Sequence, residues 1–488
     1  MSTDSAVASV EGMMLKVDPH DVGRPVAHFT PDERAARGRA ARAEVRRASH
    51  GLWEPSPLRR SPIEMLEDQA KTRLPELGAI RYGRMLASPY AFFRGAAYLM
   101  AADLADGTRT GLHAQLCGDA HLANFGVFRS LDRRLVFSIN DFDETLPGPF
   151  EWDVKRLAAS IAVASRERGF SLDRRRAAVI ATVREYRRAM ARFAGMRNVD
   201  IWYTRLDVAS IAERLAGSAS SKHLRQFETN IAAAAKKDSM RALAKLCTFV
   251  DGEPRILASP PLVTPIEDVL PGAEQEHLET VVRNMIRSYR DTLPGDRRRL
   301  LERYRYVHAA RKVVGVGSVG TRTWILLMIG RDTGDPLFLQ FKEAQASVLE
   351  PFLGRSEYPQ HGQRVVEGQR LMQAAPDVLL GWERVTTIDG QEKDFYIRQL
   401  WDAKGSADVE TMSPAVLSTY GTICGWTLAR AHARSGDPIA ISAYLGSGDV
   451  FDRALADFAE AYADQNERDY QALTDAVRSG QIAAQTGI

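Results

Sequence analysis

The stretch "CGDAHLANFG", residues 117–126, decides how this chain is interpreted. It places Asp119, His121 and Asn124 between two glycines, a composition that an ordinary core segment would not have. In phosphoryl transfer one aspartate takes the proton of the acceptor, and an asparagine five positions later binds Mg²⁺. Asp119 and Asn124 have this spacing. We expect His121 to orient the loop, and Cys117 to be a packing residue because no base partner is evident nearby.

A second acidic motif follows at "SINDFDET", residues 138–145. Its β-type run ends at Asp141, the expected metal ligand, with Asp143 as a possible second ligand. Mg²⁺ prefers a few carboxylates together with phosphate oxygens, so this small acidic set is sufficient. An acidic surface turn would explain "DFDE" alone, but both motifs would then be coincidences.

A glycine pattern stands about 200 residues later, where Gly315, Gly317 and Gly320 form G-x-G-x-x-G around Ser318. A dinucleotide-binding unit requires a helix after these glycines. Here "TRTWILLMIG" follows, which is rich in β-branched and aromatic residues and predicts a strand. Glycines between two antiparallel strands favour a flap over phosphates, as in protein kinases, while a plain glycine hairpin remains the alternative.

Lys342 ends the apolar run "LFLQFK", where a lysine is out of place unless it has a partner. We expect it to hold the α and β phosphates of a nucleotide and to pair with a glutamate on the following helix. Glu367 in "RVVEGQRL" is the first choice, and Glu350, which precedes a Pro-containing break, is the second. The alternative is a surface lysine whose stem lies along apolar neighbours.

Composition limits the classes of function. The 488 residues have 45% hydrophobic and 26% charged content, in the range of soluble globular proteins, and a formal charge of only +3 makes nucleic acid an unlikely partner. No run approaches ~18 apolar residues, so no membrane span is expected, and the N-terminus does not have the pattern of a secretory signal. Three dispersed cysteines suggest a cytoplasmic protein without a disulfide framework.

The chain divides into four predicted parts. Residues 1–30 are expected to be loosely ordered, 31–300 to form a helical lobe with the catalytic loop and metal-binding segment, 301–402 to form a β-rich nucleotide-binding lobe, and 403–488 to complete the helical lobe. The β-rich part should have strands at 312–316, 321–329 and 337–342, then a helix from "GQRVVEGQRLMQAA" and two further strands. The basic helix after Thr30 is expected to have a solvated or core-docked face.

Together "GDAHLANFG", "INDFDET" and "EWDVKRLAAS" resemble the catalytic core of aminoglycoside and choline phosphotransferases. The resemblance implies that Asp153 braces the catalytic loop and that the backbone near Gln399 and Leu400, in "YIRQL", meets adenine. Over residues 30–475 the chain also resembles a bacterial family known as domain of unknown function 2252. In an ordinary kinase the glycine flap and lysine precede the catalytic loop, whereas here they follow it. We therefore expect an α+β, protein-kinase-like, two-lobe fold that is circularly permuted, with a small antiparallel sheet lobe and a large helical lobe.

The expected function is an ATP- and Mg²⁺-dependent phosphotransferase. Asp119 would be the base, Asn124 and Asp141 the metal ligands, and Lys342 with the glycine flap the nucleotide anchor. Residues 172–300 would help to shape the acceptor site. Two alternatives stay open, namely transfer of AMP by the same fold and a pseudokinase that binds nucleotide without turnover. The sequence does not identify the acceptor, which could be a small molecule or a protein.

Overall fold

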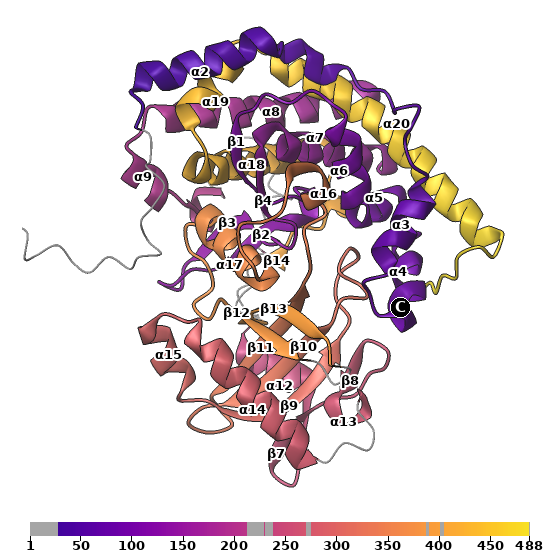
Figure 1. Cartoon of the computed structure of the whole chain (residues 1–488), viewed down its shortest axis with the longest axis vertical. Helices are drawn as coiled ribbons and strands as arrows, with labels where there is room; N and C mark the ends of the chain where they lie inside the picture. Colours follow the sequence, from indigo (N-terminus) through magenta and orange to yellow (C-terminus); the bar gives the residue numbers. More distant parts are fainter. Residues whose placement is uncertain are drawn as a thin grey trace, which may run out of the picture.

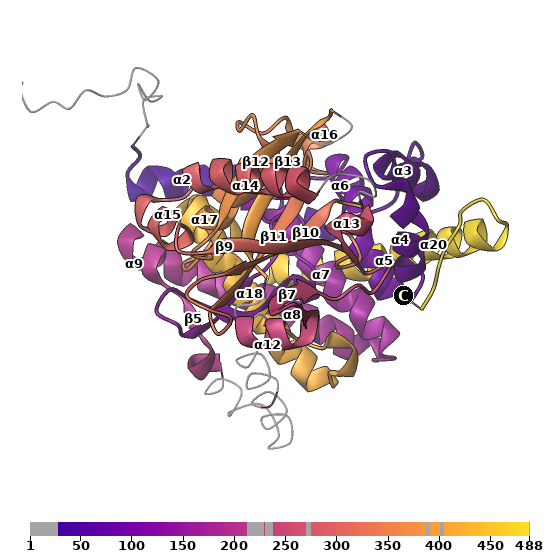
Figure 2. The same ribbon diagram turned by 90° about the horizontal axis from the view of Figure 1, so that it is seen from below.

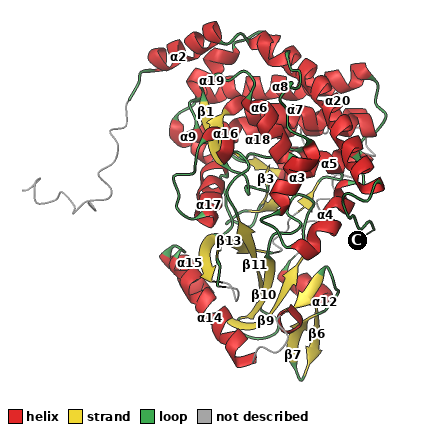
Figure 3. Ribbon diagram, turned by 45° about the vertical axis from the view of Figure 1, so that its right-hand side comes forward, coloured by secondary structure: helices red, strands yellow, loops and turns green. Residues whose placement is uncertain are grey.

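The structure is a computed structural model that describes residues 28–211, 229, 238–269, 275–386, 390–400 and 405–487. Most helices lie at one end of the molecule and the largest sheet lies at the other (Figures 1 and 3). The expectation about residues 1–30 falls almost entirely outside the described residues. The architecture is mixed α+β, with antiparallel pairing in the described sheets.

The N-terminal basic helix, α2 (Pro31–Glu44), begins at a capping box. The Thr30 hydroxyl accepts from the Glu33 backbone N–H, while the Glu33 side chain accepts from the Thr30 N–H. This helix packs against α19 (Pro438–Leu445), where Gly38 lies so close to the carbonyl of Ala440 that a side chain would not fit. The core-docked alternative is therefore confirmed.

Four long helices form the centre of the helical part: α7 (Phe150–Glu167), α8 (Leu172–Ala194), α18 (Pro414–Ser435) and α20 (Val450–Arg478). Helices α7 and α18 are buried over most of their length, and α8 packs along α18. Around them lie α3 (Pro62–Ala70), α4 (Gly78–Met85), α5 (Pro89–Gly95), α6 (Ala97–Ala105), α9 (Asn198–Tyr203) and α16 (Glu350–Leu353).

Two small sheets support the loop at 117–126. Strand β1 (His113–Leu116) pairs with β4 (Leu146–Pro149). Strand β2 (Phe125–Arg129) pairs with β3 (Leu135–Ile139), and the short strands β14 (Gly405–Ser406) and β5 (Leu206–Asp207) flank this hairpin. The loop thus starts at the end of β1 and finishes at the start of β2.

The largest sheet has six strands in the order β12-β13-β11-β10-β9-β8. They are β8 (Val263–Pro265), β9 (Arg305–Lys312), β10 (Thr323–Ile329), β11 (Pro336–Ala344), β12 (Gly381–Thr386) and β13 (Glu392–Gln399). Helix α17 (His361–Met372) follows β11, as expected from the sequence. The strand predicted at 312–316 was placed wrongly. Strand β9 ends at Lys312, where the chain leaves the sheet and turns into the glycine segment.

Both faces of this sheet are covered (Figure 2). On one face α14 (Gln275–Asp291) and α15 (Gly295–Leu301) pack on apolar side chains that include Leu339 and Phe341. On the other face α12 (Ser239–Leu246) and the hairpin of β6 (Cys247–Val250) and β7 (Glu253–Ile256) cover Ile325 and Phe338. The short helix α13 (Ile266–Val269) contacts β8 and β9. The predicted boundary at residue 300 is therefore displaced, since the described elements α12, β6, β7, α14 and α15 pack on the sheet and not within the helical part.

Among the described residues, no helix combines the length and the apolar character that crossing a membrane requires.

Candidate functional site

The loop at 117–126 is held by a buried carboxylate. Asp153, on α7, accepts hydrogen bonds from the backbone N–H groups of Cys117 at 2.8 Å and Gly118 at 3.0 Å. His432 of α18 lies beside the same carboxylate, with Nε2 3.2 Å from Oδ2. Gly118 has φ +81°, and a side chain there would meet the carbonyl of Glu144. The bracing role expected for Asp153 is therefore confirmed.

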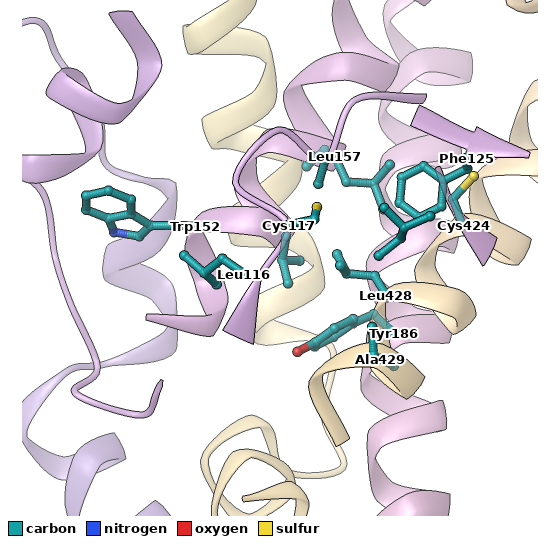
Figure 4. Close-up of a cluster of buried hydrophobic side chains, with 14 of the residues drawn as sticks. Leu116, Cys117, Phe125, Trp152, Leu157, Tyr186, Cys424, Leu428 and Ala429 are labelled. Atoms are coloured by element: carbon teal, nitrogen blue, oxygen red, sulfur yellow. The ribbon is translucent and has the colours of Figure 1, made fainter. Parts of the chain in front are cut away.

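Cys117 packs among apolar side chains that come from the strands and from α7 and α18 (Figure 4). Burial raises the pKa of its thiol well above the usual value. A thiol in this state is a packing residue and not a nucleophile, as the sequence indicated.

Asp119 points toward a buried arginine that the sequence analysis did not single out. Arg156, also on α7, donates from Nε to Asp119 Oδ1 at 2.9 Å, and its Nη2 forms an ion pair with the same oxygen at 2.8 Å. Burial nevertheless raises the pKa of Asp119 to about 6, and the opposing effect of Arg156 is smaller. A carboxylate with such a pKa is deprotonated at neutral pH but remains basic enough to take a proton.

His121 lies beside Asp119, with Nε2 3.6 Å from Oδ2. Burial lowers the pKa of its imidazole well below the usual value, so the ring is neutral. Its Nδ1 is buried and has no hydrogen-bond partner in the described part of the chain.

Asn124 joins the two acidic motifs. Its side-chain Nδ2 donates to the Asp119 carbonyl at 2.8 Å, which leaves Oδ1 as the atom that could ligate a metal. Its own carbonyl accepts from the Asn140 N–H at 2.8 Å. This bond places the segment that carries Asp141 and Asp143 beside the loop.

Lys342, at the end of β11, points between these two aspartates. Its ammonium contacts the Asp143 carboxylate and lies 3.8 Å from Asp141 Oδ2. Asp143 also accepts from the Tyr396 hydroxyl at 2.8 Å and from Ser318 Oγ at 3.4 Å. Segments that are about 200 positions apart in the sequence therefore meet at this site.

The predicted partner of Lys342 is elsewhere. Glu367, on α17, forms its ion pair with Arg370 at 2.9 Å. Glu350, the second choice, accepts from the Ser347 N–H at 3.2 Å and lies 3.8 Å from Arg364. Neither glutamate reaches Lys342, whose negative partners among the described residues are Asp141 and Asp143.

Helix α17 instead contributes Arg364, which is 1% exposed. Its guanidinium donates to the carbonyls of Asp143 at 2.8 Å, Thr145 at 2.7 Å and Gln345 at 2.7 Å. The helix thus fixes the backbone of the acidic segment. The sequence analysis missed this residue, although it lies three positions before Glu367.

The glycine segment forms a turn between β9 and β10. Gly315 and Gly320 have φ of +69° and +93°, which a residue with a side chain adopts only under strain. Arg73 donates from Nη1 to the carbonyls of Gly317 at 2.7 Å and Val319 at 2.6 Å. The Leu74 N–H donates to Gly320 at 2.8 Å, so the N-terminal helices hold the turn against the rest of the site.

These groups surround one cavity of about 540 Å³. Seven of the predicted site residues line it: Asp119, Asn124, Asp141, Asp143, Gly315, Gly317 and Ser318. Helix α5, Arg73 and the segment 343–355 complete the wall. None of the described residues of 172–300 lines it, so the described part of that region does not support its predicted role in the acceptor site.

Gln399 and Leu400 lie outside this cavity. The Gln399 N–H donates to Asp377 Oδ2 at 2.9 Å, and the Leu400 N–H donates to the Phe338 carbonyl at 3.0 Å. Both residues line a separate pocket of about 50 Å³. The backbone hydrogens expected to meet adenine are therefore used within the protein.

A divalent cation could bind to the oxygen atoms of this site only together with further ligands from outside the protein. Among the described residues, no group of three or more His, Cys, Asp and Glu side chains is arranged to hold a metal. Asp141, Asp143 and the Asn124 amide oxygen would supply the protein ligands, and Mg²⁺ commonly completes such a set with water and phosphate oxygens.

A family model described as an uncharacterised protein conserved in bacteria, DUF2252, matches residues 73–476. The chain belongs to this family. The matched region of DUF2252 includes the catalytic-type loop, the acidic segment, the glycine turn and Lys342. No curated protein and no solved structure matches the chain.

Proposed function

We propose that this DUF2252 protein is an ATP- and Mg²⁺-dependent phosphotransferase with a circularly permuted, protein-kinase-like fold. The proposal rests on one observation above the others: Asp119, Asn124, Asp141, Asp143 and the glycine turn line a single cavity, with Lys342 paired to the two acidic-segment aspartates. Phosphoryl transfer needs a base, metal ligands and a phosphate cradle in one place.

The arrangement of the sheet supports the kinase-like interpretation. The glycine turn connects two antiparallel strands, β9 and β10, and the next strand, β11, carries Lys342. A helix then follows before the last two strands. Protein kinases place their glycine-rich loop and their lysine on strands in this way.

In the proposed reaction an acceptor hydroxyl lies at Asp119 and the donor phosphates lie under the glycine turn. Asp119 takes the hydroxyl proton while the acceptor oxygen forms a bond to the γ-phosphorus. The bond between that phosphorus and the bridging oxygen of ADP breaks, and ADP leaves with the electron pair. Arg156 holds the Asp119 carboxylate in place through a hydrogen bond from Nε and an ion pair from Nη2.

Mg²⁺, when bound, would neutralise charge on the phosphates. Asp141, Asp143 and Asn124 would hold it, and Lys342 would then exchange part of its contact with Asp143 for the nucleotide phosphates. Contacts of adenine with Gln399 and Leu400 would require these residues to release Asp377 and Phe338.

The proposal is tested by thermal unfolding of the full chain with Mg²⁺ and ATP, ADP or GTP at millimolar concentration. A ligand that binds only the folded state stabilises it, by about 2.7 kcal/mol at a hundredfold excess over Kd. Asp141→Ala should lose the Mg²⁺-dependent part of the shift. Asp296→Ala, an exposed acid on α15, is the matched control. No shift with any of the three nucleotides would contradict the proposal.

A product assay then separates the alternatives. Release of ADP indicates phosphoryl transfer, and release of pyrophosphate indicates transfer of AMP. Nucleotide binding without either product would leave a pseudokinase.

A further inference from the structure

The cavity wall carries two arginines that have no acidic partner among the described residues. Arg94 lies in the last turn of α5, and Arg355 follows α16; both line the cavity. Neither forms an ion pair or a side-chain hydrogen bond in the described part of the chain, and the Nε of Arg94 is buried without a partner. Arg94 is half-buried, and a guanidinium that is partly removed from water without an anion is costly unless a ligand supplies one, whereas Arg355 is exposed at the cavity wall.

Most acids of the same wall are already paired. Asp119 pairs with Arg156, Asp143 with Lys342, and Glu343 with Arg322 at 3.4 Å. Asp68 pairs with Lys71 at 2.8 Å. The Glu144 carboxylate accepts a hydrogen bond from the Val348 N–H at 2.7 Å. Arg94 and Arg355 are therefore open to an anion from outside the protein.

Arg94 lies at the reacting end of the cavity. It is close enough to Asp119 and His121 for its charge to act on the pKa of both. Its backbone carbonyl lies under the glycine turn, 3.3 Å from the position that a Cβ of Gly317 would take. An anion at Arg94 would thus sit next to the base, where an acceptor must also lie.

We infer that Arg94 and Arg355 bind an anionic group, a phosphate or a carboxylate, of the molecule that accepts the phosphoryl group. The inference rests on the proposed function, because only that function makes this cavity an acceptor site. A guanidinium presents paired N–H donors that match the oxygens of both groups. In the proposed function Lys342 and the glycine turn bind the phosphates of the donor nucleotide, so Arg94 and Arg355 remain available for the acceptor.

The probe is inorganic phosphate, titrated calorimetrically into the full chain at low ionic strength with Mg-ADP at saturation. We expect one phosphate per chain. Arg94→Gln and Arg355→Gln should each weaken this binding about tenfold, the scale of a charge-assisted hydrogen bond. Arg94→Lys keeps the charge and should lose less. Arg299→Gln, at an 83% exposed side chain on α15, should not change the affinity.

Three results would overturn the inference: no phosphate binding by the parent, equal affinity in the parent and both glutamine variants, or an effect confined to the donor. An effect confined to the donor would have two signs. Arg94→Gln would bind the ATP analogue AMP-PNP more weakly relative to ADP, and Arg355→Gln would leave the phosphate affinity unchanged. Circular dichroism and the melting temperature confirm that each variant folds.

The same titration without nucleotide separates this inference from the proposed function. If Mg-nucleotide never binds but the binding of phosphate still depends on both arginines, the anion site is supported and the phosphotransferase proposal is wrong. If Mg-nucleotide binds and neither arginine variant changes the affinity for phosphate, the phosphotransferase proposal stands and the inference of an anionic acceptor is wrong.

Discussion

The ammonium of Lys342 contacts the carboxylate of Asp143, although 199 positions separate the two residues in the chain. This contact joins the strand that carries the lysine to the segment that carries the acids. It links the six-stranded sheet directly to the acidic segment, and the first prediction concerns it.

Lys342→Met should destabilise the fold, because it leaves Asp141 and Asp143 close together without their cation. Since their side chains remain 32% and 25% exposed, water offsets part of the cost, and we expect a loss of about 1–3 kcal/mol. Chemical denaturation measures it. The double variant Lys342→Met/Asp143→Asn should regain part of the loss, and additive effects of the two changes would contradict a direct coupling.

Asp119→Asn should separate catalysis from binding. The amide keeps the size of the side chain but cannot take a proton, so any turnover, including slow ATP hydrolysis, should fall by ~10²–10⁴. Nucleotide affinity should change little. Nucleotide binding and ATP turnover are measured on the same preparations, and equal turnover in parent and variant would remove Asp119 from its proposed role.

Turnover should fall at acidic pH. Burial raises the pKa of Asp119 to about 6, and a base acts only when it is deprotonated. The rate should therefore be flat above this pH and decline about tenfold per unit below it. Arg156 lowers this pKa, so Arg156→Met should move the decline to higher pH. A pH–rate profile of both proteins checks the sign, and a shift to lower pH would contradict it.

The motifs of residues 117–153 could be predicted because their chemistry is local. Asp119, Asn124 and Asp141 follow each other at short spacings, and the hydrogen bonds of Asp153 act on the loop that it was expected to brace. Helix α17 was also predicted, but the sequence did not predict which of its faces points into the protein. Arg364 and Glu367 are three positions apart, so helical periodicity allows either charged residue to point inward.

Other features depended on contacts between distant segments. Strand β9 has buried alanines, Ala309 and Ala310, in place of the β-branched residues that mark a strand, so its start was missed. Arg73 comes from the loop after α3, and Arg94 and Arg156 come from α5 and α7, whose charged residues look like solvated faces in the sequence. Their roles depend on tertiary packing, which no local pattern encodes.

Asp153→Ala should loosen the loop. It removes one acceptor from two backbone N–H groups and leaves them unsatisfied in the interior, at a cost of about 1–3 kcal/mol. Asp153→Asn keeps one carbonyl acceptor and should lose less. Urea unfolding ranks the three proteins, and equal stability of parent and Asp153→Ala would show that the bracing has no energetic weight.

Two glycine variants should differ in a defined order. Gly315→Ala and Gly320→Ala both force a side chain into positive φ, which costs about 1 kcal/mol. A Cβ at 315 would make only an ordinary contact with Ser318 at 3.9 Å, whereas one at 320 lies 2.9 Å from the Cβ of Arg73. Gly320→Ala should therefore have the lower melting temperature, and the reverse order would mean that Arg73 does not hold the turn.

The wide separation of Lys342 from Asp143 also has a consequence for synthesis on the ribosome. At the usual ~5–20 residues per second, the 199 positions correspond to an interval of about 10–40 s. During this time the nascent chain exposes the acidic segment before its cation has been made. A messenger RNA truncated before codon 342 would yield a fragment that contains Asp119, Asp141 and Asp143 but lacks the lysine that pairs with the last two.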